Sequence, residues 1–278
     1  MVAVILLLLS RYRLTPFSNA IASTTEVGIR GKTPAPTPVG GAIDELPTLE
    51  KPHQQLTYEQ SVAILKQEAN VAAQLRQERL TILAGDSLSL WFPADLLPQE
   101  QTWLKQGIAG DTSTGLLRRL KLFDKTQPET IFIMIGINDL LRGVSDKTIL
   151  QNQRLIIQYL RRVHPDSEIV VQAILPHSGE GSKWEGRDRQ FAVSNSQIRQ
   201  LNRQTKAIAA EVGVKYLDLH PLFTDAQGNL RSELSTDGLH LNARGYLVWR
   251  SALQMYSKLG IVTMQATLVL GLADQLSA

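Results

Sequence analysis

Ser87 follows directly on a short apolar stretch and is well placed to act as a nucleophile. Residues 80–84 are largely apolar, Gly85 and Asp86 end the stretch, and Ser87 comes next. Open α/β sheets build their sites where parallel strands end. A serine hydroxyl is a poor nucleophile at neutral pH, so it must lose its proton to a base as it attacks. Ser87 therefore requires a histidine partner.

The segment Asp237-Gly238-Leu239-His240 supplies that partner. A neutral imidazole can accept the serine proton, and a carboxylate on its other nitrogen fixes the tautomer and stabilises the imidazolium that forms. Asp237 and His240 are three positions apart, so one local turn can join them. We predict that Ser87, Asp237 and His240 are the catalytic residues of a serine hydrolase.

Two further segments are candidates for binding the oxyanion of a tetrahedral intermediate. Gly110 and Asn138 each follow an apolar stretch that reads as a strand. A glycine lets its backbone N–H approach a ligand closely, and an asparagine amide adds a neutral donor. Such donors are important, because the loss of one typically lowers the rate by about 100- to 1000-fold.

These segments, in this order, resemble the four sequence blocks of the SGNH (GDSL) hydrolase superfamily. The resemblance covers roughly residues 80–259. The residues around Gly110 and Asn138 are similar to those of bacterial thioesterase, arylesterase and lysophospholipase members. It implies that Ser87 is the nucleophile and that its N–H completes an oxyanion hole with Gly110 and Asn138. Ile137 departs from the pattern, because those members usually carry a second glycine there; the departure narrows the approach to the oxyanion and leaves the subfamily open.

Other polar residues near these segments have structural interpretations. We expect Asp139 to hold its loop through backbone hydrogen bonds and Asp86 to be structural. Asp111 is expected to cap a helix that begins near Thr112.

Four histidines compete with His240. His220 follows Asp218 on a predicted strand, but Pro221 suggests a chain that turns away into a surface loop. His53 and His164 are interpreted as solvent-facing loop residues. His177 opens a polar insertion, residues 177–195, that reads as a mobile lid or rim.

Within this insertion, His177 and Trp184 are possible substrate contacts. Trp184 could stack on a sugar or cover an acyl chain, or could fold onto its own loop.

Predicted strands and helices alternate along the chain, and the strands are continuous apolar runs. This pattern predicts a three-layer α/β/α sandwich with a central parallel sheet, the flavodoxin-like architecture of SGNH hydrolases. The predicted strands are residues 80–84, 130–135, 168–174 and 214–219, and the predicted helices are 57–77, 112–121, 145–163, 194–212 and 243–259. The catalytic domain is expected at 57–262, with an N-terminal helix at 57–78.

The rest of the chain is divided by composition. Residues 1–13 form a short apolar segment that reads as the remnant of a membrane anchor or signal, residues 14–56 a Pro/Gly-rich linker, and residues 263–278 a tail. This arrangement favours membrane association through the N-terminal segment and a membrane-tethered or extracytoplasmic location, with a cytoplasmic one as the alternative.

Composition limits the partners. The chain has 278 residues, a formal net charge of +3 and no cysteine. No basic run exceeds two residues, so nucleic acid is not implied. Neither a metal site nor a cofactor is supported, and the oligomeric state cannot be read.

The predicted activity is cleavage of carboxylic ester or thioester bonds in a small-molecule substrate, through an acyl-enzyme on Ser87. The alternatives are a carbohydrate O-acetylesterase or acyltransferase of the cell envelope, and an inactive binding module on the same fold.

Overall fold

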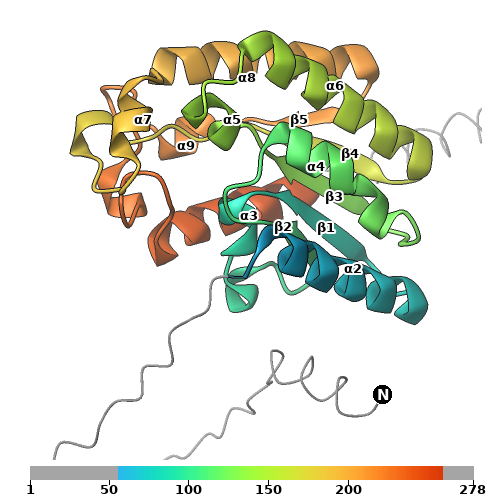
Figure 1. The fold of residues 1–278 in the computed structure, drawn as a ribbon. Coiled ribbons are helices and arrows are strands. Elements are labelled where there is room, and N and C mark those ends of the chain that lie inside the picture. Colours follow the sequence, from blue (N-terminus) through green and yellow to red (C-terminus); the bar gives the residue numbers. More distant parts are fainter. Residues whose placement is uncertain (1–55, 259–278) are drawn as a thin grey trace, which may run out of the picture. The chain divides into compact units, whose positions relative to one another are not determined.

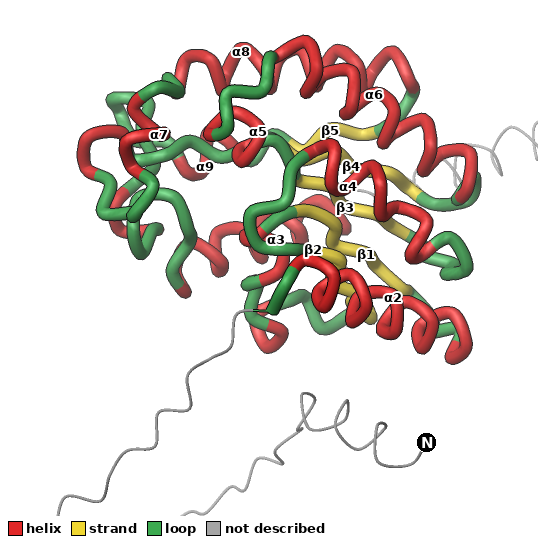
Figure 2. Tube along the Cα trace, in the orientation of Figure 1, coloured by secondary structure: helices red, strands yellow, loops and turns green. Residues whose placement is uncertain are grey.

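The computed structural model of the chain describes residues 56–258 and is built around a parallel sheet of five strands (Figures 1 and 2). The strands are β1 (Leu80–Gly85), β2 (Thr102–Gly107), β3 (Thr130–Met134), β4 (Glu168–Gln172) and β5 (Lys215–Leu217). Their order is β2-β1-β3-β4-β5. After β1 the chain forms β2 along one edge of β1, and it then crosses over to form β3 along the other edge. Open α/β sheets bind ligands at such a reversal, outside the carboxyl ends of the strands.

Three of the long helices start at hydroxyl caps. Thr57 forms a capping box with Gln60, and Ser145 and Ser194 each accept a hydrogen bond from the third residue of the helix that follows. The helices are α2 (Tyr58–Leu75), α3 (Ser87–Leu90), α4 (Ser113–Arg119), α5 (Ile137–Leu141), α6 (Asp146–Val163), α7 (Arg187–Phe191), α8 (Asn195–Val212) and α9 (His220–Phe223). A further helix occupies residues 243–258.

Alternate side chains of the strands fill two cores. On one face, Leu83, Phe132 and Val170 pack with side chains of α3, α9 and the helix at 243–258, among them Trp249. On the other face, Ile82, Ile131 and their neighbours pack against α2, α4 and α6, and α8 joins that layer beside β4. Both faces of the sheet are therefore covered, and the predicted three-layer α/β/α architecture is confirmed.

Two details of the prediction were wrong. His164, expected to face solvent, is buried and stacks on Phe123. The edge strand β2 was not among the predicted strand ranges.

The predicted segments 1–13 and 263–278, His53 and nearly all of the 14–56 linker lie outside the described residues. Among residues 56–258, no helix has the length and apolar character needed to cross a membrane. The expected bounds of the catalytic domain remain a prediction.

Candidate active site

Ser87 is the first residue of α3, immediately after β1. The carboxylate of Asp86 caps this helix by accepting a hydrogen bond from the Leu88 N–H at 3.1 Å. The first N–H groups of a helix have no partner within the helix, so the Ser87 N–H lies at a terminus suited to negative charge. Ser87 is 6% exposed. The structure thus puts the predicted nucleophile at the carboxyl end of a central strand.

Asp237 and His240 form a hydrogen-bonded pair. The Asp237 Oδ2 lies 2.7 Å from His240 Nδ1, and its Oδ1 accepts from the backbone N–H groups of Leu239 and His240 at 2.9 and 2.7 Å. Burial alone would raise the pKa of Asp237, but these hydrogen bonds outweigh it and hold the pKa below its usual value. The carboxylate therefore stays ionised at neutral pH and orients the imidazole.

Trp91 connects this pair to the helix of Ser87. Its indole ring meets the His240 imidazole edge to face, with ring centroids 4.7 Å apart and planes at 62°. The Trp91 N–H also donates to the Ser87 carbonyl at 2.9 Å. No hydrogen bond joins the Ser87 hydroxyl to His240 within residues 56–258; this aromatic contact links the two segments that carry the predicted catalytic residues. Trp91 was not among the residues predicted from the sequence; its position four residues after Ser87, one helical turn away, was the available signal.

Gly110 and Asn138 are brought to adjacent positions by α5. The Asn138 amide donates to the Asp111 carbonyl at 3.0 Å, and Arg142, one turn later, donates to the Gly110 carbonyl at 2.7 Å. Gly110 has φ +74°, a left-handed conformation that favours glycine. Asn138 on α5 and Arg142 directly after α5 therefore hold the turn that carries Gly110, a predicted donor to the oxyanion.

Asp139 is buried and ties α5 to α4. Its carboxylate accepts from the Ser113 N–H at 2.7 Å and from the Ser113 hydroxyl at 2.6 Å, and Asn152 donates to the same hydroxyl at 2.9 Å. Burial raises the pKa of Asp139, while the hydrogen bonds from Ser113 lower it. The expected structural role is confirmed.

Asp111 differs from expectation. Thr112, not Asp111, caps α4, and Asp111 forms a buried ion pair with Arg119 at 2.7 Å. Arg119 also donates to the carbonyls of Gln106 and Gly85, so it joins the ends of β2 and β1. Because the Asp111 carboxylate pairs with this buried guanidinium, it does not cap α4.

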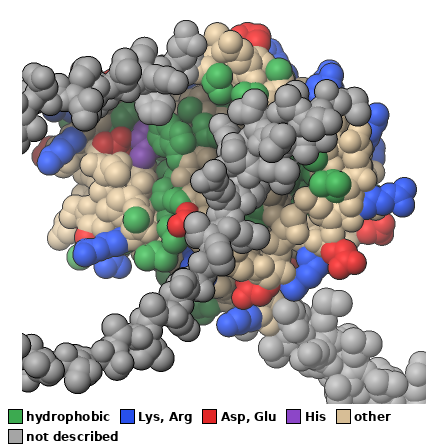
Figure 3. Space-filling model, turned by 90° about the horizontal axis from the view of Figure 1, so that it is seen from below, with side chains coloured by type: hydrophobic (Ala, Val, Ile, Leu, Met, Phe, Trp, Pro, Cys, Tyr) green, Lys and Arg blue, Asp and Glu red, His purple; other side chains and the backbone are tan. Residues whose placement is uncertain are grey.

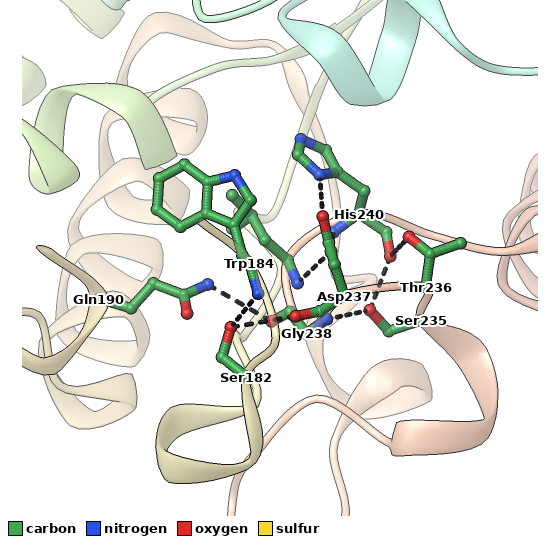
Figure 4. Close-up of polar contacts among 9 residues, drawn as sticks. Ser182, Trp184, Gln190, Ser235, Thr236, Asp237, Gly238 and His240 are labelled. Atoms are coloured by element: carbon green, nitrogen blue, oxygen red, sulfur yellow. Dashed lines mark hydrogen bonds and ion pairs between the residues drawn. The ribbon is translucent and has the colours of Figure 1, made fainter. Parts of the chain in front are cut away.

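The insertion at 177–195 holds the backbone of the Asp237–Gly238 turn. The Asp237 carbonyl accepts from the N–H groups of Lys183 and Trp184 at 2.7 and 2.8 Å and from the Ser182 hydroxyl at 3.0 Å. Figure 4 shows Ser182 and Gln190 reaching the turn, while the His240 imidazole extends beyond the Asp237 carboxylate, away from them. We call these contacts the turn clamp.

Gly238 fits into the turn clamp only because it lacks a side chain. It has φ +94°, and a Cβ at this position would lie 2.8 Å from the Ser182 Cα. The catalytic turn and the insertion are therefore packed backbone against backbone.

His177 is buried within the insertion, and a substrate contact by this residue remains a prediction. It is 3% exposed, its Nε2 lies 2.7 Å from the Val193 carbonyl, and its Nδ1 accepts from the Gly179 N–H at 3.0 Å. Burial lowers the pKa of His177, so it is neutral at pH 7. Both ring nitrogens are used inside the insertion, which makes it a structural residue.

The other expectations in this region have mixed outcomes. Trp184 is half-buried, and its ring packs against the cluster that includes Ile137, Val193 and Leu239. His220 is buried at the start of α9, where its Nδ1 lies 3.0 Å from the Thr224 hydroxyl, so Pro221 begins a short helix and not a surface loop. A substrate contact by Trp184 remains a prediction.

The surface near the site is partly apolar. On the face seen in Figure 3, a histidine and an acidic side chain lie beside a run of apolar side chains. Trp91 is the large apolar side chain that contacts His240, and it is 49% exposed. Residues 56–258 contain no group of three or more His, Cys, Asp or Glu side chains that could hold a metal ion.

Comparisons with known proteins identify the family of the chain. The model of the GDSL-like lipase/acylhydrolase family matches residues 69–248. Platelet-activating factor acetylhydrolase IB subunit alpha1 of Rattus norvegicus is 24% identical over 187 residues, which are 63% of this chain and 74% of the relative. An arylesterase of Vibrio mimicus is 34% identical over 105 residues, covering 32% of this chain and 52% of the relative.

Solved structures share the fold. A protein from Streptococcus pneumonia, provisionally named a platelet activating factor, is 27% identical and has a TM-score of 0.60, covering 69% of this chain and 92% of its own. A GDSL-like lipase from Bacteroides thetaiotaomicron is 16% identical, with a TM-score of 0.59 and coverage of 72% and 99%.

Proposed function

Because the chain belongs to the GDSL-like lipase/acylhydrolase family, we propose that it hydrolyses carboxylic esters or thioesters through an acyl-enzyme on Ser87. The observation that carries the proposal is the Asp237–His240 pair, whose imidazole contacts Trp91 of the segment that begins with Ser87. Names of the relatives, acetylhydrolase and arylesterase, favour short acyl groups and aryl esters as the first substrates to test.

The proposed reaction has two steps. In the first, the Ser87 oxygen attacks the carbonyl carbon, His240 takes the serine proton, and the carbonyl electron pair moves onto the oxygen, where N–H groups of Ser87 and Gly110 and the Asn138 amide bind it. The intermediate collapses as His240 gives its proton to the leaving alcohol or thiol. In the second step, water attacks the acyl-enzyme and gives a proton to His240; the bond to the Ser87 oxygen then breaks, His240 returns the proton to that oxygen, and the acid leaves.

Replacement of the nucleophile tests this proposal. Ser87→Ala should lower kcat/KM for p-nitrophenyl acetate by about 10⁴- to 10⁶-fold, because the hydroxyl that forms the acyl-enzyme is gone. The unaltered protein should also be labelled by a fluorophosphonate probe, and the variant should not. Ser251→Ala is a suitable control, because that hydroxyl donates to Leu247 on an exposed helix face and should change neither result.

The outcomes separate the alternatives. Undiminished turnover by a folded Ser87→Ala protein rejects the assignment of the nucleophile. A folded, unaltered protein that takes no label and turns over no ester is instead a binding module. A series of acyl lengths then distinguishes a lipase-type enzyme, whose activity rises with length, from an O-acetylesterase, which turns over acetyl esters alone. Product analysis with a competing alcohol identifies an acyltransferase.

A further inference from the structure

Trp91 is a large apolar side chain held half in solvent at the catalytic histidine. It is 49% exposed while its ring contacts the His240 imidazole. Exposed aromatic residues are common on protein surfaces and need no explanation by themselves. This one is different because of its position, since α3 fixes it one turn after Ser87.

The chemistry of the proposed reaction defines what lies beside Trp91. In the first step His240 must give a proton to the oxygen of the departing alcohol, so this alcohol lies against the imidazole. The carbonyl oxygen must face the other donors, on the Gly110 turn and the start of α5, which are held to each other by Asn138 and Arg142. The indole is therefore on the leaving-group side of the ester and not on its oxyanion side.

The local environment of the imidazole supports this placement. Nδ1 is used by Asp237, which leaves Nε2 for proton transfer. The indole packs edge to face on the same ring, and half of its own surface is open to solvent. A planar apolar group attached to the leaving oxygen would cover that open surface and remove it from water.

We propose that Trp91 is a specificity-determining residue that binds the alcohol part of the substrate, and that it favours aryl esters over small alkyl esters. The inference rests on the proposed function, because it takes the direction of the leaving group from that mechanism. Aromatic pairs contribute about 0.5–1.5 kcal/mol beyond area burial, which corresponds to roughly a 2- to 10-fold preference.

The test compares two esters that share an acyl group. Trp91→Ala should lower kcat/KM for phenyl acetate by roughly 2- to 10-fold more than for ethyl acetate. Trp91→Phe should recover part of that difference, because it keeps an aromatic face. Leu155→Ala is the control: Leu155 is similarly exposed but lies on α6, in the layer over the other face of the sheet, and should leave the ratio unchanged.

A second comparison fixes the side of the ester on which Trp91 acts. The ratio of phenyl butyrate to phenyl acetate turnover should be the same in Trp91→Ala as in the unaltered protein, because only the acyl part differs. A changed ratio would place Trp91 on the acyl side and overturn the inference. An equal loss on phenyl and ethyl acetate also overturns it, since the indole then only orients His240. Neither result affects the proposed function, which depends on Ser87→Ala.

Discussion

At the scale of single residues, Asp86 is a fully buried carboxyl group directly before Ser87. Burial raises its pKa from 3.8 to about 7, and the nearby carboxylates of Asp111 and Asp139 add to this, while the hydrogen bond from Leu88 opposes it. Its Oδ2 is buried and has no hydrogen-bond partner in the structure. The fold therefore keeps a carboxyl group directly before the nucleophile in an environment that resists its ionisation.

This arrangement predicts a pH-dependent stability. Below pH 3.8 Asp86 is protonated in both the folded and unfolded chains; between 3.8 and about 7 it ionises in the unfolded chain first, so its contribution to stability falls as pH rises. Asp86→Asn keeps the helix cap but cannot ionise. The difference in the free energy of unfolding between the variant and the unaltered protein should therefore increase from pH 4 to pH 8 in favour of the variant. The increase should be on the order of 4 kcal/mol at most.

Urea unfolding at these two pH values measures the gain. Asp95→Asn provides the control, because Asp95 is exposed in the 3-10 helix Ala94–Leu96 after α3, and this variant should show no comparable change. If the difference between Asp86→Asn and the unaltered protein is the same at both pH values, the carboxyl group does not titrate as described.

Residue types were predicted better than residue surroundings. Asp237 and His240 were found from the sequence because a carboxylate and an imidazole three positions apart can pair within one turn. The surroundings of His177 could not be foreseen, because its partners, Val193 and Gly179, contribute backbone groups that any residue could provide. Trp91 was missed because its contact with His240 joins two distant segments, and its spacing of one helical turn from Ser87 was a weak local signal.

At the scale of elements, the turn clamp joins the 177–195 insertion to the turn that carries the predicted catalytic acid. The sequence, rich in glycine and polar residues, predicted a mobile lid or rim. In the structure the insertion contains a short 3-10 helix (Gly179–Gly181) and α7, and it supplies three donors to a single carbonyl, that of Asp237. Ser182 is the one side chain among these donors, so it is a positioning residue that can be tested.

Removal of its hydroxyl should weaken the hold on the catalytic acid. We expect Ser182→Ala to lower kcat by about 2- to 10-fold with little change in KM, since one hydrogen bond of about 0.5–1.5 kcal/mol is lost from the turn that orients His240. Ser182→Thr keeps a hydroxyl and should recover most of kcat. Steady-state kinetics with p-nitrophenyl acetate measure both values.

Ser178→Ala is a matched control in the same insertion. The Ser178 hydroxyl donates to the Leu230 carbonyl and not to the Asp237–Gly238 turn. The hydrogen bond from the Ser178 N–H to the Gly238 carbonyl is retained in the variant. If Ser178→Ala and Ser182→Ala lower kcat equally, the effect is a general loosening of the insertion, and Ser182 has no special role.

Long elements were predicted closely and short ones were not. The helices α6 and α8 were expected to within one residue, because an apolar stripe and a serine cap mark each of them. β2 was not placed, since its partly polar sequence, with Lys105 and Gln106, suits an edge strand and gives no continuous apolar run. α7 has five residues, too few for a helical pattern to show.

At the scale of the whole molecule, two ion pairs allow a comparison of buried and exposed charge. Arg119 and Asp111 are each 3% exposed, and Arg119 also binds the ends of β1 and β2. Arg154 and Glu211 join α6 to α8 on the surface, where they are 35% and 64% exposed. The first pair is part of the packed core, and the second is solvated.

The two arginines should therefore differ in their effect on stability. Arg119→Met leaves a buried carboxylate and two strand-end carbonyls without their partner, and we expect it to lower the free energy of unfolding by about 3–5 kcal/mol. Arg154→Met removes an exposed pair and should cost less than about 1 kcal/mol. Chemical denaturation of both variants at one pH gives the comparison, and equal losses would show that burial does not set the strength of these pairs.

The overall architecture was predictable because apolar strands and amphipathic helices alternate repeatedly along the chain. Continuous apolar strands between helices predict a covered parallel sheet, and this fixes the end of the sheet at which side chains meet. The pairing order of the strands and the contact between Trp91 and His240 depend on the packing of distant segments, for which the sequence carries no local pattern.

The distance in the chain between Ser87 and the Asp237–His240 turn has a consequence for biosynthesis. The segments predicted to carry the nucleophile and the oxyanion donors leave the ribosome long before the predicted base and acid, so under the proposed function the nascent chain cannot cleave esters until nearly the whole described fold has been made. Recovery of esterase activity during refolding would for the same reason require that the segment of Ser87 and the Asp237–His240 turn have docked, in addition to the formation of the sheet.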